Sequence, residues 1–197
     1  MQFHLTNLSE LDLNGHYTYA DYVTWQFEEM VELIKGKVFK MSPAPTRYHQ
    51  RVSHNLNGLL YGVTRGKLCQ AYSAPTDVRF ITKGSEDKDI TTVVQPDLFI
   101  VCDPSKLDSN GCLGSPDFIV EIISPATATK DLKIKFELYQ QAGVGEYWVV
   151  YPGEQVIHVF LLINGKYVPS GVYTEHGPIP LQTLTGITLE LQDIFEP

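Results

Sequence analysis

The sequence predicts a single α/β domain, residues 1–197, in which helices flank a mixed central sheet. Three observations predict this class. Short runs rich in Val, Ile, Phe and Tyr, typical of strands, alternate with two segments of helical periodicity. The second helical segment, 129–143, joins strand-like runs at 117–124 and 146–152, which is the order of a strand–helix–strand unit with locally parallel strands. The chain is also long enough to bury a core without disulfide or metal support.

The remaining elements are predicted from local patterns. A helix at 46–66 places its apolar residues on one side and ends at Gly66, which suits the C-terminal end of a helix. The Asn164–Gly165 pair is the strongest turn signal in the chain and predicts an added C-terminal β-hairpin at 155–173. The other expected elements, in chain order, are a short helix at 17–27, two short strands within 30–43, and strands at 71–81 and 93–102.

Composition and charge limit the class of protein. The chain is 43% hydrophobic and 19% charged, as expected of a soluble globular protein, and no apolar run is long enough to span a bilayer. The N-terminal sequence lacks the basic and apolar segments of a signal peptide, which favours the cytoplasm. Cys69, Cys102 and Cys112 show no disulfide or zinc pattern, so we expect reduced thiols. The net charge of −8 weighs against broad adhesion to nucleic acid or anionic membranes and lends DNA binding no support.

Two acids stand out because each lies within an apolar strand candidate. Asp97 occurs in QPDLFIVC, and Glu121 occurs 24 residues later in DFIVEIIS. If these strands are neighbours in one sheet, both carboxylates can face the same side at the same end. Two buried carboxylates repel each other and are costly to desolvate unless a cation compensates them. Carboxylate oxygens with a backbone carbonyl and water suit Mg²⁺ or Mn²⁺ rather than zinc, so the pair predicts such a site.

A lysine is predicted to point at the same place. At about 100° per residue, the apolar residues of the 129–143 helix form one broad arc with Lys135 near its middle, whereas Lys133 falls on the opposite, solvent side. Because this helix follows the strand of Glu121, Lys135 can reach that carboxylate and Asp97. Asp, Glu and Lys converging at a sheet edge suit phosphodiester hydrolysis, since the ammonium can orient water or stabilise charge on phosphate.

Each of these assignments has a structural alternative. Glu121 can form a salt bridge with an inward lysine without any metal, because the same geometry produces both arrangements. Asp97 can begin a turn after Pro96. Lys135 can extend its charge to the edge of a groove while its stem packs against apolar residues.

Three further residues are candidates for supporting the site. His49 lies on the apolar side of the 46–66 helix, where a hydrogen-bonded core histidine is the alternative to a role near phosphate or water. His54 lies off that side, so the two do not form a zinc pair. Asp77 is a further acid that could approach the metal, although a turn or an ion pair with Arg79 is the default expectation. Tyr139 is expected to pack beside the lysine, with its hydroxyl near the rim of the site.

The quoted motifs resemble those of a known superfamily. A PD pair followed by a strand with Glu121 is similar to the PD-(D/E)XK nucleases, whose sheet bears PD on one strand and (D/E)XK on the next. More specifically, MSP, QPDLFIV, PDFIVEIISPAT and DLKIKFELYQQAGVGEYWVVYP resemble the Uma-two family of restriction endonuclease-like proteins, over most of the chain from Tyr19 to the hairpin. The resemblance implies a restriction-endonuclease-like core, Mg²⁺ (or Mn²⁺) as cofactor, double-stranded DNA as partner and, by analogy, a homodimer.

The resemblance also implies roles for single residues. Asp97 and Glu121 match the metal-binding acids, and Glu32 in VELIKGK matches an early acid that can join them, with an exposed strand acid as the alternative. The lysine usual two residues after the glutamate is here Ile123, and the resemblance assigns that function to Lys135. The sequence therefore predicts a metal-dependent DNA endonuclease. The rival hypothesis, motivated by the acidic charge and by Ile123, is a catalytically inactive nucleic-acid-binding or regulatory module that retains the nuclease fold.

Overall fold

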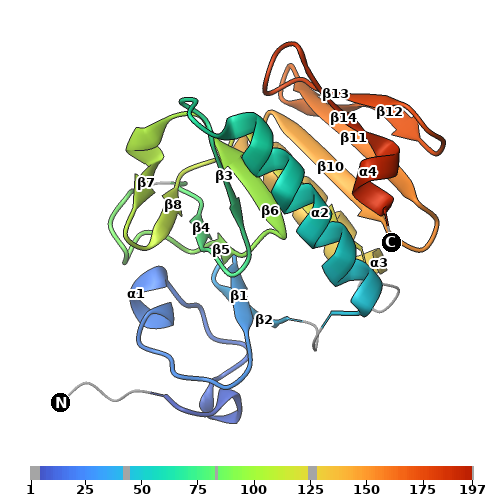
Figure 1. The fold of residues 1–197 in the computed structure, drawn as a ribbon. Helices are drawn as coiled ribbons and strands as arrows, with labels where there is room; N and C mark the ends of the chain where they lie inside the picture. Colours follow the sequence, from blue (N-terminus) through green and yellow to red (C-terminus); the bar gives the residue numbers. More distant parts are fainter. Residues whose placement is uncertain (1–4, 42–44, 83, 124–127, 197) are drawn as a thin grey trace.

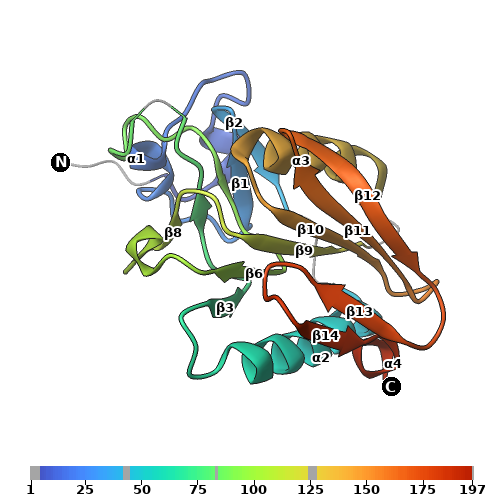
Figure 2. The same cartoon turned by 90° about the horizontal axis from the view of Figure 1, so that it is seen from above.

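The computed structural model describes residues 5–41, 45–82, 84–123 and 128–196. Within them, the strands form two six-stranded sheets and one two-stranded sheet. Helices α2 and α3 cover opposite faces of one of the larger sheets (Figures 1 and 2). This mixed α/β architecture confirms the predicted fold class. In the part of the chain that is described, no helix is long and apolar enough to cross a membrane.

The helical elements are mostly short, and two of them are long enough to cover a sheet. They are η1 (Leu8–Glu10), α1 (Tyr19–Tyr22), α2 (Arg47–Thr64), η2 (Pro104–Lys106), α3 (Ala128–Ala142) and α4 (Leu191–Phe195).

The strands belong to three sheets. The N-terminal sheet consists, in spatial order, of β2 (Lys37–Lys40), β1 (Val31–Ile34), β5 (Val93–Val94), β4 (Val78–Arg79), β8 (Gly111–Leu113) and β7 (Leu107–Asp108). The main sheet consists, in spatial order, of β12 (Lys166–Tyr173), β11 (Val156–Ile163), β10 (Glu146–Tyr151), β9 (Phe118–Ile122), β6 (Leu98–Val101) and β3 (Gln70–Ser73). The third sheet pairs β13 (Pro178–Leu181) with β14 (Ile187–Glu190).

Most of the predicted elements are present. The strands β9 and β10 pair in parallel on either side of α3 along the chain, as the strand–helix–strand pattern predicts. The predicted hairpins form β1–β2 and β11–β12. Lys35 and Gly36 adopt φ of 51° and 78°, and Asn164 and Gly165 adopt 51° and 74°. Two successive positive φ values are characteristic of the tight turns that match the twist of a hairpin.

Two predicted strands are wrong in extent, and this changes the architecture. The run at 71–81 contains β3 and β4, and the run at 93–102 contains β5 and β6, with the two members of each run in different sheets. Pro75 and Pro96 lie between them, and proline cannot donate a hydrogen bond to a sheet. The single sheet expected from the sequence is therefore divided into the N-terminal and main sheets, and Asp97 lies where the chain passes from one to the other.

The ends of the chain also differ from expectation. The helix predicted at 17–27 is only the four residues of α1, because the following aromatic residues pack on one another instead of continuing the helix. The segment after β12 contains β13, β14 and α4, which were not predicted. The loop between β6 and β9 contains η2, β7 and β8.

The core has two main apolar clusters, one on each face of the main sheet. On one face, Leu56 and Leu60 of α2 pack in a cluster with Phe118 and Val120 of β9. On the other face, residues of α3 pack in a cluster that includes Ile119. Because side chains alternate along a strand, Glu121 follows Ile119 onto the α3 face. The strand β9 is thus covered on both faces, and the carboxylate of Glu121 points toward α3.

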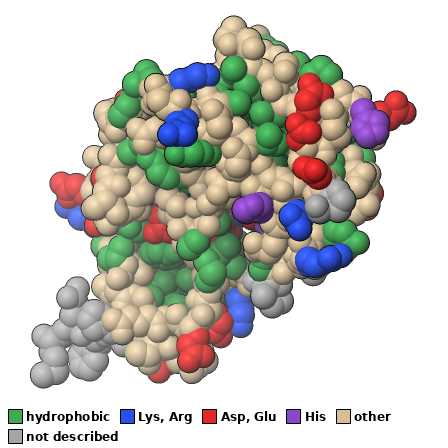
Figure 3. Space-filling view, in the orientation of Figure 1, with side chains coloured by type: hydrophobic (Ala, Val, Ile, Leu, Met, Phe, Trp, Pro, Cys, Tyr) green, Lys and Arg blue, Asp and Glu red, His purple; other side chains and the backbone are tan. Residues whose placement is uncertain are grey.

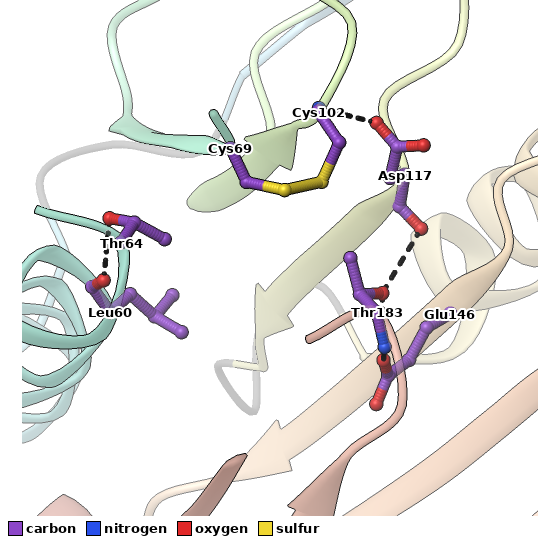
Figure 4. Close-up of a disulfide and its surroundings, with 7 residues drawn as sticks. All are labelled: Leu60, Thr64, Cys69, Cys102, Asp117, Glu146 and Thr183. Atoms are coloured by element: carbon purple, nitrogen blue, oxygen red, sulfur yellow. Dashed lines mark hydrogen bonds between the residues drawn. A yellow bond between two sulfur atoms is a disulfide. The ribbon is translucent and has the colours of Figure 1, made fainter. Parts of the chain in front are cut away.

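A disulfide joins Cys69, just before β3, to Cys102, just after β6 (Figure 4). The expectation of three reduced thiols is therefore wrong for this pair, whereas Cys112 is free and buried. The strand register explains the bond. Gln70 pairs with Val101, so the next residues outward, Cys69 and Cys102, lie opposite each other.

The end of the main sheet near the disulfide is held by buried Glu146. Its carboxylate accepts hydrogen bonds from Thr183 N at 2.7 Å and from Thr183 Oγ1 at 2.8 Å (Figure 4). It also accepts one from Trp148 Nε1 at 2.8 Å. A cleft of about 330 Å³ opens beside Glu146 and Cys102. Since both oxygens of this carboxylate are already bonded, and since Asp97 and Glu121 lie at the opposite ends of β6 and β9, the candidate site lies away from this cleft.

The packing of α2 can be tested with two leucine substitutions. Leu56 is fully buried and Leu68 is 66% exposed. We expect Leu56→Ala to lower the free energy of unfolding by about 2–5 kcal/mol, because it leaves a cavity between α2 and the main sheet, and Leu68→Ala to lower it by less than about 0.5 kcal/mol. Urea denaturation measures both; equal losses would contradict the assigned packing of α2.

Candidate functional site

The candidate site begins where Asp97 and Glu121 meet across two strands. β6 and β9 are antiparallel, with Leu98 opposite Val120, so continuing the register by one residue puts Asp97 opposite Glu121. Residues directly opposite each other in an antiparallel pair lie on the same face. The carboxylate of Asp97 accepts a hydrogen bond from the backbone N–H of Ile122 at 2.7 Å. The predicted pairing of the two acidic strands is thus confirmed.

Lys135 reaches this point from α3. Its Nζ lies 3.0 Å from Glu121 Oε1 and 2.9 Å from Glu32 Oε1, and its side chain is only 12% exposed. Tyr139, one turn further along α3, donates its hydroxyl to the same Glu121 oxygen at 2.6 Å. Lys133 is exposed. The inward direction predicted for Lys135 from helical periodicity is confirmed. Tyr139 was expected to pack with its hydroxyl near the rim of the site, and its hydroxyl instead bonds directly to the buried carboxylate of Glu121.

Glu32 joins the two sheets at this point. It lies on β1 of the N-terminal sheet and is buried rather than exposed. Its Oε1 accepts hydrogen bonds from Lys135 and, at 3.0 Å, from the backbone N–H of Gln95. We refer to Glu32, Lys135 and Glu121 as the ion triad. It ties the N-terminal sheet to α3 and to β9 of the main sheet.

Burial and charge shift the pKa values of the triad. Burial raises the pKa of Glu121 to about 7; the charge of Lys135 lowers it, and the charges of Asp97 and Glu32 raise it further. Burial alone would lower the pKa of Lys135, but the two glutamates more than offset this and raise it. Lys135 is therefore charged at every working pH. The raised pKa of Glu121 has burial as its main cause, and the charges of Asp97 and Glu32 add to it.

His49 and Asp77 flank the site on two sides. His49 Nε2, on the first turn of α2, lies 3.3 Å from Asp97 Oδ1, so it is a hydrogen-bonded histidine packed against the site. Burial lowers its pKa, but the hydrogen bond and charge of Asp97 outweigh burial and raise it. Asp77 does not form the ion pair expected with Arg79, because Arg79 pairs with Asp108.

Gln95 is a site residue that the sequence did not single out. Its side-chain amide donates to Asp77 Oδ1 at 2.9 Å while its backbone N–H donates to Glu32. Burial raises the pKa of Asp77, and the hydrogen bonds from Gln95 and Tyr22 lower it. Asp77 is thus connected to the triad through Gln95. The signal in the sequence is the place of Gln95 directly before Pro96 and Asp97.

The carboxylate oxygens of the site are of the type that binds a hard divalent cation, but several of them already bond to neighbouring groups. Among the described residues, no group of three or more His, Cys, Asp or Glu side chains is arranged around one point as metal ligands. Glu32 and Glu121 both direct Oε1 at Lys135. Asp97 and Glu121 offer carboxylate oxygens, which are the donors that Mg²⁺ and Mn²⁺ prefer. An ion held by these two acids would complete its coordination with water rather than with a cage of protein side chains.

Ile123 occupies the position where the motif resemblance leads us to expect a lysine. It packs at the edge of the apolar cluster beneath α3. The ammonium at the acids comes from Lys135 instead, twelve residues later in the chain.

The fold of this chain is similar to that of a solved structure. A crystal structure described as "a putative nuclease belonging to DUF820 from Anabaena variabilis ATCC 29413" aligns with a TM-score of 0.68 at 18% identity, covering 91% of this chain and 97% of that one. Residues 19–192 match the Uma2 family, described as "Putative restriction endonuclease". The chain belongs to this family, as the motifs in its sequence indicate. No curated protein matches the chain.

Replacing Lys135 with alanine tests the balance of charge in the triad. The change leaves Glu32 and Glu121 buried without their cation, so the metal-free variant should lose about 3–5 kcal/mol of unfolding free energy at about pH 8. A glutamate whose pKa is raised by folding destabilises the protein above that pKa and ceases to do so below its unfolded value. The deficit should therefore shrink at about pH 5.

Urea denaturation at the two pH values measures this deficit. Lys133→Ala, on the exposed side of the same helix, is the matched control and should change stability by less than about 0.5 kcal/mol at either pH. The account of the triad is contradicted if Lys135→Ala loses no more stability than the control.

Proposed function

We propose that this protein is a metal-dependent endonuclease that hydrolyses phosphodiester bonds of DNA. The observation that carries the proposal is the buried ammonium of Lys135, 3.0 Å from Glu121 and 2.9 Å from Glu32, beside Asp97 at the junction of two sheets. A charged lysine and a pair of carboxylates, one with a raised pKa, are typical of functional sites. Membership of a family described as restriction endonucleases supports the same class of reaction.

Asp97 and Glu121 would hold Mg²⁺ (or Mn²⁺), and Glu32 would assist them. A divalent cation at such a site polarises the phosphate and lowers the pKa of water. The protein fixes both acids in advance. Tyr139 and Lys135 bond to one oxygen of Glu121, and the N–H of Ile122 bonds to Asp97.

Lys135 has a second part in the proposed reaction. An ammonium group has three N–H donors, and two of them are directed at Glu121 and Glu32. The third is available for a phosphate oxygen or for the attacking water. Because the side chain is largely buried, its charge acts in a medium of low dielectric constant, where it stabilises developing negative charge more strongly than in water.

The finer features of the proposal rest on family membership. Double-stranded DNA is the proposed substrate and a homodimer the proposed assembly, by analogy with nucleases of this fold, which often dimerise to cut both strands. The cytoplasmic location suggested by the N-terminal sequence stays a prediction. The disulfide between Cys69 and Cys102 weighs against it, because disulfides are rare in that compartment.

A second candidate function is a nucleic-acid-binding or regulatory module without catalysis. One observation favours it: Glu121 Oε1 already accepts hydrogen bonds from both Lys135 and Tyr139, so this oxygen has structural partners without any metal. Such a protein would bind nucleic acid and leave it intact.

Cleavage of supercoiled plasmid DNA tests the proposed function. With millimolar Mg²⁺ or Mn²⁺ the wild-type protein should nick or linearise the plasmid, and EDTA should abolish this. Glu121→Gln and Lys135→Ala should each lower the rate by at least about 100-fold, because each removes a group placed at the phosphate. Lys133→Ala is the control and should retain full activity.

Two results would count against the proposal. Full activity in both Glu121→Gln and Lys135→Ala would contradict the assignment of these residues to the active site. No cleavage of any nucleic acid with either metal would leave the binding module as the function.

A further inference from the structure

The solvent face of α2 has a charge opposite to that of the chain as a whole. The segment 45–76 carries four of the fifteen Lys and Arg residues and none of the 23 Asp and Glu residues. All four cations are exposed: Arg47, Arg51, Arg65 and Lys67. None of them forms an ion pair within the described part of the chain. An unpaired basic segment in a protein of net charge −8 marks a local surface for an anion.

Three of the cations, Arg47, Arg51 and Arg65, lie along one side of α2 and its C-terminal cap together with His54 and Tyr61, and we call this set the stripe. At about 100° per residue, the side chains of Arg47, Arg51, His54, Tyr61 and Arg65 lie within an arc of about 80° on α2. From Arg47 to Arg65 the stripe is about 27 Å long, at 1.5 Å per residue.

The middle of the stripe is flat. A side chain added at Gly58 or Gly62 would meet nothing within 4 Å, so the bare backbone of α2 faces solvent there. Tyr61 beside them is 58% exposed. At the N-terminal end, the guanidinium of Arg47 lies 5.3 Å from the centre of the exposed ring of Tyr48. A flat basic track with exposed aromatic rings suits a sugar–phosphate backbone, which can approach the glycines closely.

The stripe is bounded on one flank. Asn55 donates hydrogen bonds to the backbone carbonyls of Ile194 and Glu196, so the α4 segment packs alongside α2. Asp193 and Glu196 are exposed there. Figure 3 shows basic side chains near both ends of α2 and acidic ones gathered over the C-terminal segments beside it. The charges on this flank would repel a polyanion, whereas those of the stripe would attract one.

The stripe begins at the candidate site. His49, which contacts Asp97 at 3.3 Å, lies on the inner side of the same turn that carries Arg47 and Arg51. We infer that the solvent face of α2, from Arg47 to Arg65, binds the phosphate backbone of double-stranded DNA next to the phosphodiester group that lies at Asp97 and Glu121. This rests on the proposed nucleic-acid substrate but not on cleavage. The acidic net charge of the chain does not oppose it, because the charges are separated between surfaces.

Fluorescence anisotropy tests the inference with a duplex of about 30 base pairs, in EDTA so that binding is measured without metal-dependent cleavage. Arg47→Glu/Arg65→Glu should weaken binding at least about tenfold at low salt and should lower the slope of log affinity against log salt by about two. Lys133→Glu/Lys166→Glu makes the same change in net charge on exposed lysines elsewhere and should bind within about twofold of wild type. Circular dichroism confirms that both variants fold.

Four outcomes would overturn the inference. The wild type does not bind the duplex, or the two double variants weaken binding equally. Alternatively, Arg47→Glu/Arg65→Glu weakens binding of single-stranded DNA but not of the duplex, or it changes the oligomeric state of the protein without changing its DNA affinity. The last would mark α2 as a contact between copies of the chain. A plasmid cleavage assay separates this inference from the proposed function. If the wild type cleaves the plasmid but Arg47→Glu/Arg65→Glu binds DNA as the wild type does, the nuclease function is retained and the α2 surface is rejected. If the double variant loses DNA binding but the wild type does not cleave, the α2 surface is retained and the nuclease function is rejected.

Discussion

The site depends on one electrostatic constraint: Lys135 is buried between two glutamates that are themselves buried. Each charge is costly to remove from water, so each needs its partners in place. Glu32 comes from the N-terminal sheet, Glu121 from the main sheet and Lys135 from α3. The interaction can form only when these three elements are assembled, and it therefore couples the arrangement of the two sheets to the geometry of the site.

The ion triad has two carboxylates and one ammonium, and this excess of negative charge affects both the stability of the fold and the proposed binding of a metal ion. Glu121 has a pKa raised to about 7 because burial, Asp97 and Glu32 all oppose its ionisation. A divalent cation bound beside Asp97, as we propose, would relieve this repulsion, so metal binding and folding would support each other. The basic face of α2 supplies the complementary feature, since it holds a polyanion near an acidic site that would otherwise repel it. Charge is thus divided between a buried acidic centre and an exposed basic helix.

Much of the site could be predicted from the sequence because it follows from local periodicity. The 3.6-residue repeat of α3 predicted that Lys135 points inward, and the apolar strands around Asp97 and Glu121 predicted burial, which holds for Glu121, whereas Asp97 is half-buried. What could not be predicted depends on contacts distant in the chain. The division of 71–81 and 93–102 between two sheets, the pairing of Arg79 with Asp108 instead of Asp77, the bond between Cys69 and Cys102, and the link through Gln95 all require strand partners that no local pattern specifies.

The central claim is that Asp97 and Glu121 form a divalent-cation site completed by Lys135. Anomalous diffraction from a crystal grown with Mn²⁺ tests it most directly, because the ion can be located independently of any activity. The account predicts one anomalous peak in contact with carboxylate oxygens of Asp97 and Glu121, at about 2.0–2.3 Å, with the ammonium of Lys135 close by and water filling the remaining positions. An anomalous map without a peak at these acids, or with Mn²⁺ bound only elsewhere on the chain, would contradict it.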